Sequence, residues 1–204
     1  FINFSPPYII MENKGALIVI VATLLVLVAI WFLVGVRISM STEQVNYTLI
    51  EELGDGVEIR QYEENTFISA DAGGSNSGFR ILSGYIFGKN EQNTKIAMTA
   101  PVISRQEGDV MHMSFVLPEG YDSKNAPAPL EEGVMIHDVA PRKVVAIKFS
   151  GYVTDSKIES HRTILEEKIS ENGLNTKGEI FLMRYNPPWV PPMLMKNELA
   201  VEIE

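Results

Sequence analysis

Several kinds of residue are absent or scarce in this chain of 204 residues. There is no cysteine, which excludes disulfide scaffolds, thiolate metal sites and cysteine nucleophiles. The three histidines, His112, His137 and His161, lie far apart in the sequence and show no metal-ligand spacing. No nucleophile, base and orienting group can be identified together. We therefore expect no catalytic residues, no metal site and no enzyme activity.

Basic residues are also few. The chain has 17 Lys and Arg against 26 Asp and Glu. Leaving out Lys14, Arg37 and Glu12, residues 38–204 have 15 basic and 25 acidic residues, a net charge of −10. Such a surface repels phosphate backbones, so we expect no nucleic-acid partner.

Charge is missing altogether from residues 16–36. These 21 residues, ALIVIVATLLVLVAIWFLVGV, would span roughly 30 Å as a helix, the thickness of a bilayer core. A secretory signal has a shorter apolar run and a small-residue cleavage site, which this segment lacks. A buried core helix would show a polar stripe. We therefore predict a single-pass membrane anchor that contacts the lipid bilayer.

The flanks of this anchor are less informative. Lys14 and Arg37 balance one another, so both orientations of the chain across a membrane stay open. Residues 1–10 begin without methionine, whereas Met11 opens a plausible start, and we interpret residues 1–10 as an upstream extension or an artefact. The expected organisation is a tail (1–15), the anchor (16–36), a linker (37–46) and a folded domain (47–204).

The folded part contains an internal repeat. VEIRQYEENTFISADAGG (57–74) aligns without gaps with VMIHDVAPRKVVAIKFSG (134–151), 77 positions later. Each segment has β-branched and aromatic residues around a polar turn, which predicts one hairpin in each half. Neither half can bury its apolar face alone, so the two should close over a shared core. The polar residues 119–133 are expected to link the halves.

A helix should follow each hairpin. The first is expected to run from about residue 75 to Gly88, with Phe79, Leu82 and Ile86 at helical spacing. The second should run from about residue 154 to Gly173. Each helix gives way to two further strands, separated by a break that contains proline.

The stretch YNPPWVPPMLM, near the C-terminus, is stiff and apolar. Its four prolines exclude a helix or a central strand. Trp189 and the methionines are too apolar for an ordinary solvated linker. Such a loop packs on its own core, which is the commoner case, or lines a ligand site. The residues themselves leave both interpretations open.

Four segments of the domain follow one another between about Tyr47 and Ile203: VEIRQY, GFRILSGYIFGKN, KIAMTAPV and YNPPWVPPMLMKNELAVEI. Together they resemble the SOUL heme-binding protein family. The resemblance implies an α+β fold, a distorted antiparallel eight-stranded barrel with two helices built from two pseudo-repeats, here joined to an N-terminal transmembrane helix. It also implies non-covalent binding of heme or related tetrapyrroles in an apolar groove between the first helix and the proline-rich loop.

Carried over position by position, the resemblance also implies a set of cofactor-binding residues. Gln61 stands where some family members have a histidine proposed as an iron ligand, and glutamine ligates iron poorly, so the axial ligand stays unassigned. Arg80, Lys89 and Lys196 are the candidates for contacts with propionates. The implied residues are Gln61, Phe79, Leu82, Ser83, Ile86, Trp189, Val190, Met193 and Met195.

The sequence thus favours a membrane-anchored protein that binds heme or a related tetrapyrrole for carriage, buffering or sensing. The alternative is a binding domain for other amphipathic small molecules without iron ligation, because Gln61 removes the most iron-specific feature. Equal affinity for heme and for its iron-free analogue would point to recognition by shape alone.

Overall fold

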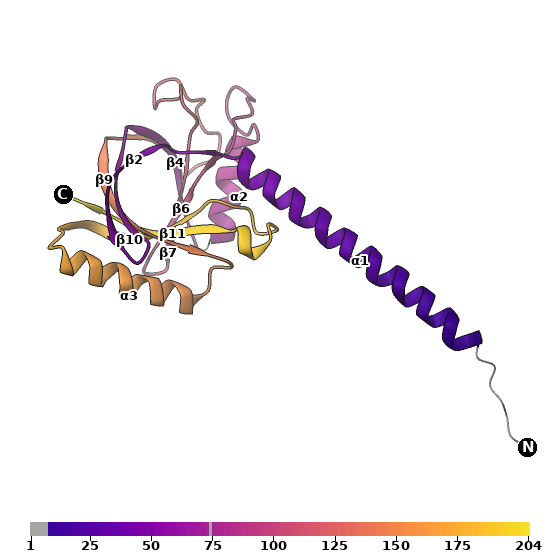
Figure 1. The fold of residues 1–204 in the computed structure, drawn as a ribbon. Coiled ribbons are helices and arrows are strands. Elements are labelled where there is room, and N and C mark those ends of the chain that lie inside the picture. Colours follow the sequence, from indigo (N-terminus) through magenta and orange to yellow (C-terminus); the bar gives the residue numbers. More distant parts are fainter. Residues whose placement is uncertain (1–7, 74) are drawn as a thin grey trace, which may run out of the picture.

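The computed structural model describes residues 8–73 and 75–204, and it shows a long helix projecting from an α+β domain (Figure 1). Of the expected N-terminal extension, residues 1–7 lie outside the described residues. In chain order the elements are α1 (Tyr8–Ser41), β1 (Glu43–Gln44), β2 (Tyr47–Gly54), β3 (Val57–Tyr62), β4 (Asn65–Ala72), α2 (Ser75–Ile86), β5 (Thr99–Ala100), β6 (Val102–Glu107), β7 (Val110–Val116), β8 (Val134–Val139), β9 (Arg142–Ser150), α3 (Asp155–Glu171), β10 (Thr176–Arg184), the 3-10 helix η1 (Pro192–Leu194) and β11 (Lys196–Ile203).

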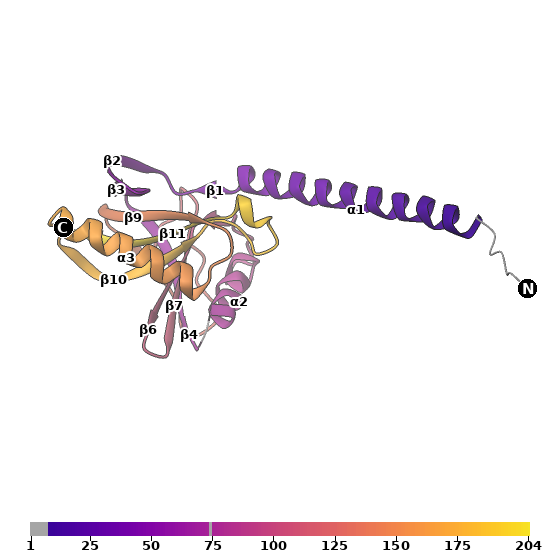
Figure 2. The same cartoon turned by 60° about the horizontal axis from the view of Figure 1, so that its bottom comes forward.

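The helix α1 lies apart from the domain along most of its length (Figures 1 and 2). The helix expected over residues 16–36 is confirmed, and it continues to Ser41. It is long and apolar enough to cross a membrane, and its apolar side chains are largely exposed. Length and composition of this kind are shared by membrane spans and by signal sequences.

Nine strands form one curved sheet in the order β2-β3-β9-β11-β10-β6-β7-β4-β8. All neighbouring strands in it are antiparallel. The α+β class is confirmed, but the closed eight-stranded barrel is wrong: the sheet has nine strands, and the strands at its two edges, β2 and β8, do not pair. A separate parallel pair joins β1 to β5 near the end of α1.

The two halves of the repeat exchange their first strands. β3 and β8 begin 77 positions apart, as do β4 and β9, so the repeat is confirmed. The expected hairpins are wrong, however, because β3 pairs with β9 and β4 pairs with β8. Two-residue hairpin turns require positive φ angles, and the connections Glu63-Glu64 and Ala140-Pro141 have none. The chain therefore runs on, and each first strand completes the sheet of the other half.

Each half-sheet is covered by one helix on its outer face. α2 packs on β4 and β7, and α3 packs on β9 and β11. Leu82 and Leu165 are the fully buried anchors of the two helices. Thr154 caps α3 by accepting a hydrogen bond from Lys157 N at 3.3 Å, and Gly173 follows the helix with a positive φ. These ends agree with the predicted helix boundaries.

The opposite face of the sheet, here called the inner face, folds around a second apolar cluster. Tyr62, Val144 and Ala200 on this face come from both halves of the repeat. The expected shared core is thus present, although the sheet around it remains open. The buried members of the cluster are Tyr62, Ala100, Val144, Ala146, Met183, Tyr185 and Ala200.

Candidate functional site

The helix α2 divides its predicted groove residues between a buried face and the edge of that face. Leu82 and Ile86 are fully buried against the sheet. Phe79, Ser83 and Phe87 follow at i, i+4 and i+8 along the edge of this buried face. Phe79 is 43% exposed, with its ring 5.3 Å from that of the buried Phe115, and Phe87 is 66% exposed. Ser83 is half-buried between them. α2 therefore presents two aromatic rings separated by one small side chain.

The loop between β10 and β11 divides its residues in the same way. Val190 and Met195 are buried, whereas Trp189 is 64% and Met193 69% exposed. The short helix η1 stiffens the loop, with Leu194 N donating to Pro191 O at 2.8 Å. The loop thus packs on the core and also directs two large apolar side chains outward. Neither of the two interpretations of this segment excludes the other.

α2 and this loop lie side by side, next to the domain end of α1, in both Figure 1 and Figure 2. Eight of the nine implied residues therefore belong to two neighbouring elements. Gln61 does not: it lies on β3, and its side-chain amide donates to Tyr62 O at 2.9 Å. The exposed apolar surface formed by Phe79, Phe87, Trp189 and Met193 is here called the α2–loop surface.

Phe87 was not identified from the sequence, although a signal for it was present. It stands eight residues after Phe79, and Phe87 N donates to Ser83 O at 2.9 Å, so the helical geometry extends one residue beyond α2. The sequence prediction followed the i, i+3, i+7 pattern, which marks the face of a helix turned to the core. The outward stripe needed the i, i+4, i+8 pattern instead.

The loop is also bonded to α1. Trp31 Nε1 donates to the backbone carbonyl of Trp189 at 2.7 Å, and Asn186 Nδ2 donates to Ser39 Oγ at 2.8 Å. The partners lie about 150 positions apart in the sequence, so the local sequence does not predict these bonds. The α2–loop surface is therefore positioned by the helix as well as by the domain.

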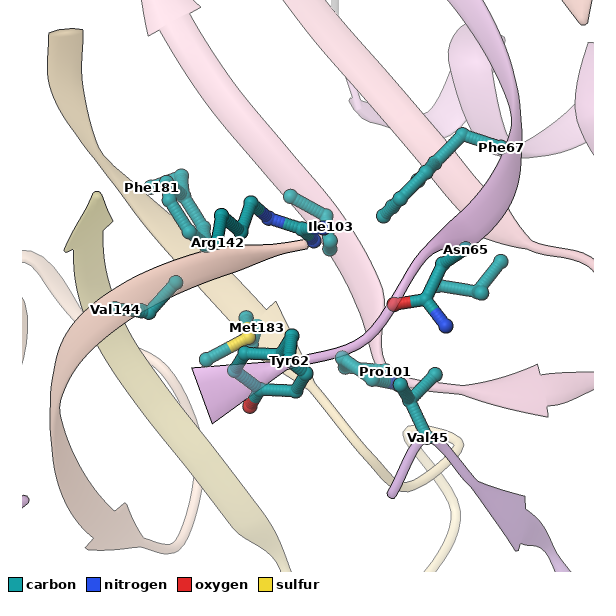
Figure 3. Close-up of a pocket in the computed structure, with 11 residues that line it drawn as sticks. Val45, Tyr62, Asn65, Phe67, Pro101, Ile103, Arg142, Val144, Phe181 and Met183 are labelled. Carbon is teal, nitrogen blue, oxygen red and sulfur yellow. The ribbon is translucent and has the colours of Figure 1, made fainter. Parts of the chain in front are cut away.

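Two hollows lie on the inner face, and neither is lined by α2 or by the loop. In the first, Phe67, Asn65 and Arg142 point into a common space (Figure 3) of only about 10 Å³, enough for about one water molecule. The second adjoins it and encloses about 200 Å³. Pockets for drug-sized ligands are usually about 300–1,000 Å³. A tetrapyrrole therefore fits neither hollow.

Some polar atoms that face these hollows have no partner. Arg142 Nη1, Arg105 Nε and Asn65 Oδ1 are buried and make no hydrogen bond within the described part of the chain. Burial lowers the pKa of Arg142, although the carboxylate of Glu202, 3.1 Å from its Nε, acts in the opposite direction. Buried donors of this kind generally bind water or a ligand.

The other end of the inner face is closed by buried charges. Arg60 donates two hydrogen bonds to Glu198, at 2.7 and 3.0 Å, and both side chains are fully buried. Tyr185 donates a third to Glu198 at 2.7 Å. Burial alone would raise the pKa of Glu198, but the hydrogen bonds and charge of Arg60 outweigh it and lower the pKa. This carboxylate is fully engaged and leaves no room for a cationic ligand.

The histidines do not form a metal site. Within residues 8–73 and 75–204, no group of three or more His, Asp or Glu side chains could hold a metal ion. Each histidine is engaged separately: His112 with Asp71 at 2.6 Å, His137 against the Phe67 ring and His161 with the carbonyl of Lys157. α2 and the loop contain no histidine, so neither element supplies an imidazole to the α2–loop surface.

The comparison with known proteins identifies the family. The family model described as SOUL heme-binding protein matches residues 42–202. The chain belongs to the SOUL heme-binding protein family. Mouse Heme-binding protein 2 is 31% identical, with 62% of this chain and 68% of that protein covered. Heme-binding protein 1 of Xenopus laevis is 25% identical, with 69% and 80% covered. The family resemblance seen in the sequence is thus confirmed.

Solved structures with a similar fold are more distant from this SOUL-family chain in sequence. The C-terminal domain of EcmrR has a TM-score of 0.55 at 11% identity, covering 78% of this chain and 98% of its own. A hydrolase from Listeria innocua has a TM-score of 0.53 at 9% identity, covering 72% and 91%. At these identities the likeness concerns the fold alone.

Proposed function

We propose that this SOUL-family protein binds heme or a related tetrapyrrole non-covalently on the α2–loop surface, and that α1 anchors it in a membrane. The observation that carries the proposal is the group of exposed side chains on two neighbouring elements, Phe79, Phe87, Trp189 and Met193. Large apolar side chains exposed together on neighbouring elements often mark a binding site. The two similar proteins from mouse and Xenopus laevis are heme-binding proteins by name, which supports heme as the ligand.

The chemistry of this surface suits a flat, apolar macrocycle with acidic edges. The two phenylalanines and Trp189 would stack on its ring and exclude water from it. Arg80 and Lys89 are exposed at α2 and are available for propionates. Lys196 is less available, since its ammonium lies 3.8 Å from the centre of the Tyr185 ring and 3.5 Å from Glu198. A bound heme would supply redox and ligand-binding chemistry at its iron.

The proposed role is carriage, buffering or sensing of the ligand, without catalysis. The family is named for binding, and this supports a binding role. The net charge of −10 over residues 38–204 also disfavours nucleic acid as a partner.

The membrane part of the proposal rests on α1. Its apolar side chains between Leu17 and Leu33 are exposed to the surroundings, and none of them packs on the domain until the helix reaches the loop. Such a surface is stable in hydrocarbon and unfavourable in water.

A hemin titration of the full chain in detergent micelles, followed by the Soret band, tests the proposal. Trp189→Ala should weaken hemin binding by roughly tenfold or more, because a large aromatic contact is lost. The fold should persist, since the bond from Trp31 uses the backbone carbonyl of Trp189. Met135→Ala, which removes an apolar side chain 54% exposed on the edge strand β8, is the matched control and should bind normally. Normal binding by folded Trp189→Ala would refute the proposed site.

Binding of iron-free protoporphyrin distinguishes recognition of the macrocycle by shape from recognition through an axial iron ligand. The α2–loop surface carries no histidine, so we expect similar affinities for hemin and protoporphyrin. A strong preference for hemin, with a sharp low-spin Soret band, would instead require an axial ligand from the protein.

A second candidate function is favoured by the larger hollow on the inner face. Phe67, Ile103 and Phe181 give it an apolar wall. Arg105 and Arg142 also line it, and each has one buried N–H group without a partner among the described residues. This combination suits a small aromatic carboxylate. Benzoate should then raise the melting temperature of the wild type and of Trp189→Ala, but not that of Arg142→Gln. No shift in the wild type would eliminate this candidate.

A further inference from the structure

One stripe of α1 is covered by the loop between β10 and β11. Trp31 donates to the carbonyl of Trp189, and Ser39 accepts from Asn186. Between them, Gly35 lies against Pro191. Positions 31, 35 and 39 are spaced at i, i+4 and i+8, so they lie on one side of the helix. The loop thus follows α1 for about two turns.

The glycine at position 35 permits this close approach. Within residues 14–41 it is the one buried residue. A Cβ atom added there would lie 2.4 Å from Pro191 Cδ, a distance that real Cβ contacts do not show. Gly15, on the same helix, has no atom within 4 Å of the corresponding position. The contact is therefore specific to the domain end of α1.

The contact between the loop and α1 lies beside the last turns of the apolar run of the helix. That run ends at Val36, and Trp31 stands five residues before its end, which is roughly 7–8 Å along a helix axis. The carbonyl of Trp189 is bonded at this level. When residues 16–36 occupy a bilayer core, the tip of the loop must therefore reach the boundary between headgroups and acyl chains.

The side chains of the loop suit that boundary. Trp189 and Met193 are its two most exposed large apolar side chains, and no residue from 185 to 195 is charged. Tryptophan is enriched at membrane interfaces because its ring is apolar and its N–H is polar. Arg37, exposed beside the contact, can extend its guanidinium to the headgroups.

We propose that the loop is a second membrane contact of this protein, with Trp189 and Met193 inserted in the lipid interface beside α1. The inference rests on the proposed function in one respect, the crossing of the membrane by α1. It adds that the α2–loop surface faces the bilayer and takes its amphipathic ligand from the lipid phase. The loop is thus the lipid-facing edge of the binding site.

The absence of cysteine makes the test direct. Single-cysteine variants of the full chain, Leu25→Cys in α1, Met193→Cys in the loop and Glu171→Cys at the end of α3 distant from α1 (Figures 1 and 2), are labelled with an environment-sensitive fluorophore. They are reconstituted in phosphatidylcholine vesicles. We expect the labels at 25 and 193 to emit as in lipid and to resist iodide quenching. The label at 171 should be quenched as in water.

The outcomes separate the inference from the proposed function. A label at 25 in lipid with a label at 193 in water would overturn the inference and leave the membrane anchor intact. A label at 25 in water would remove the anchor and the inference together, whereas hemin binding would be unaffected. Spin-labelled lipids should quench the label at 193 more strongly when their nitroxide lies near the headgroup than when it lies deep.

Gly35→Ala tests whether the contact with α1 sets the position of the loop. The added Cβ must displace Pro191, so iodide quenching of the label at 193 should increase at least twofold. Gly15→Ala is the matched control and should change nothing. Unchanged quenching in Gly35→Ala would show that the contact does not hold the loop in the interface, contrary to the proposal.

Discussion

The inner face has two ends, one around Arg60 and Glu198 and one around His137 and His112. They occupy equivalent positions of the repeat but carry different side chains. One end is closed by a buried ion pair, and the other is a hollow lined by two histidines. The equivalence follows from the 77-residue offset and from the matching registers of β4 with β7 and of β9 with β11. The equivalent pairs are Arg60 with His137, Glu198 with His112, and Lys148 with Asp71.

Side-chain length decides which end is closed. Arg60 on β3 reaches over β9 to Glu198 on β11, and the two side chains fill the space between them. His137 stacks on Phe67, 6.0 Å between ring centres, while His112 turns to Asp71. The histidines do not span the intervening strand, and a hollow of about 200 Å³ remains. One backbone arrangement thus yields a sealed end and an open end.

Truncating the equivalent side chain at each end should give the largest contrast. Glu198→Ala leaves Arg60 buried without its main partner, and we expect a loss of about 3–5 kcal/mol in the free energy of unfolding. His112→Ala, at the equivalent position, replaces a partly exposed side chain and should cost under about 1 kcal/mol. Urea denaturation of the full chain in micelles measures both. Equal losses would contradict the distinction between the ends.

The double variant Arg60→Leu, Glu198→Leu should be more stable than either single variant. A buried ion pair gives back much of its attraction as desolvation cost, so apolar replacement of both partners is often close to neutral. We expect the double variant to recover at least half of the loss. Denaturation curves of the three variants check this. Losses that simply add would show that the two side chains do not stabilise one another, and a double variant as unstable as Glu198→Leu would show that the pair contributes more than it costs to bury.

Acid should weaken the sealed end. Burial alone would raise the pKa of Glu198 and of Glu58, but hydrogen bonds and charges from Arg60, and from Lys148 for Glu58, lower both below the usual 4.5. A carboxylate whose pKa is lower in the folded than in the unfolded state stabilises the fold at pH values above its unfolded pKa. This contribution is lost as the pH falls through the folded-state pKa. Denaturation midpoints should therefore hold from pH 7 to about 5 and decline below about 4.5. The decline should be shallower in Glu198→Gln, and a decline beginning near pH 6 would contradict it.

The outer partners of the two ends should matter least. Lys148 bonds to Glu58, and Asp71 bonds to His112, and both residues are well exposed to solvent. Exposed ion pairs usually contribute under about 1 kcal/mol. We expect Lys148→Met and Asp71→Asn each to change the free energy of unfolding by less than that amount. A larger loss for Lys148→Met alone would show that this exposed lysine also contributes to the stability of the sealed end.

Much of this fold could be predicted because its signals are local. The spacing of Phe79, Leu82 and Ile86 indicated α2, and the 77-residue offset aligned the strands of the two halves. The exchange of β3 and β8 could not be predicted, since a strand, a short polar connection and a strand look alike whether or not they pair. The barrel prediction was wrong for a related reason. The local sequence of an edge strand does not indicate whether that strand pairs with the other edge of the sheet.

The ion pair between Arg60 and Glu198 could not be predicted from the local sequence either. Arg60 follows Ile59 in β3, and both are buried because both faces of that strand are covered. Its partner Glu198 is 138 positions away, so nothing near Arg60 indicates that its charge is compensated.

The residues implied for the site can be compared with the structure only in their positions. The resemblance selected α2 and the loop, and the structure brings those elements together. The sequence could not distinguish Leu82 and Ile86, which are fully buried, from Phe79 and Phe87, which are exposed to 43% and 66%. That distinction depends on where the sheet lies relative to the helix. The role of the nine residues in binding stays a prediction.

The exchange of first strands has a consequence for the origin of the chain. A polypeptide of one repeat would lack the strand that completes its own sheet, and a second copy of itself would supply it. The ancestor would thus have been an obligate homodimer with two-fold symmetry, joined by reciprocal strand donation. Gene duplication and fusion through residues 119–133 would have joined the two copies of that dimer in one chain. Once the partners were tied together, the two copies of each position were free to diverge, and the present asymmetry between sealed and open ends became possible.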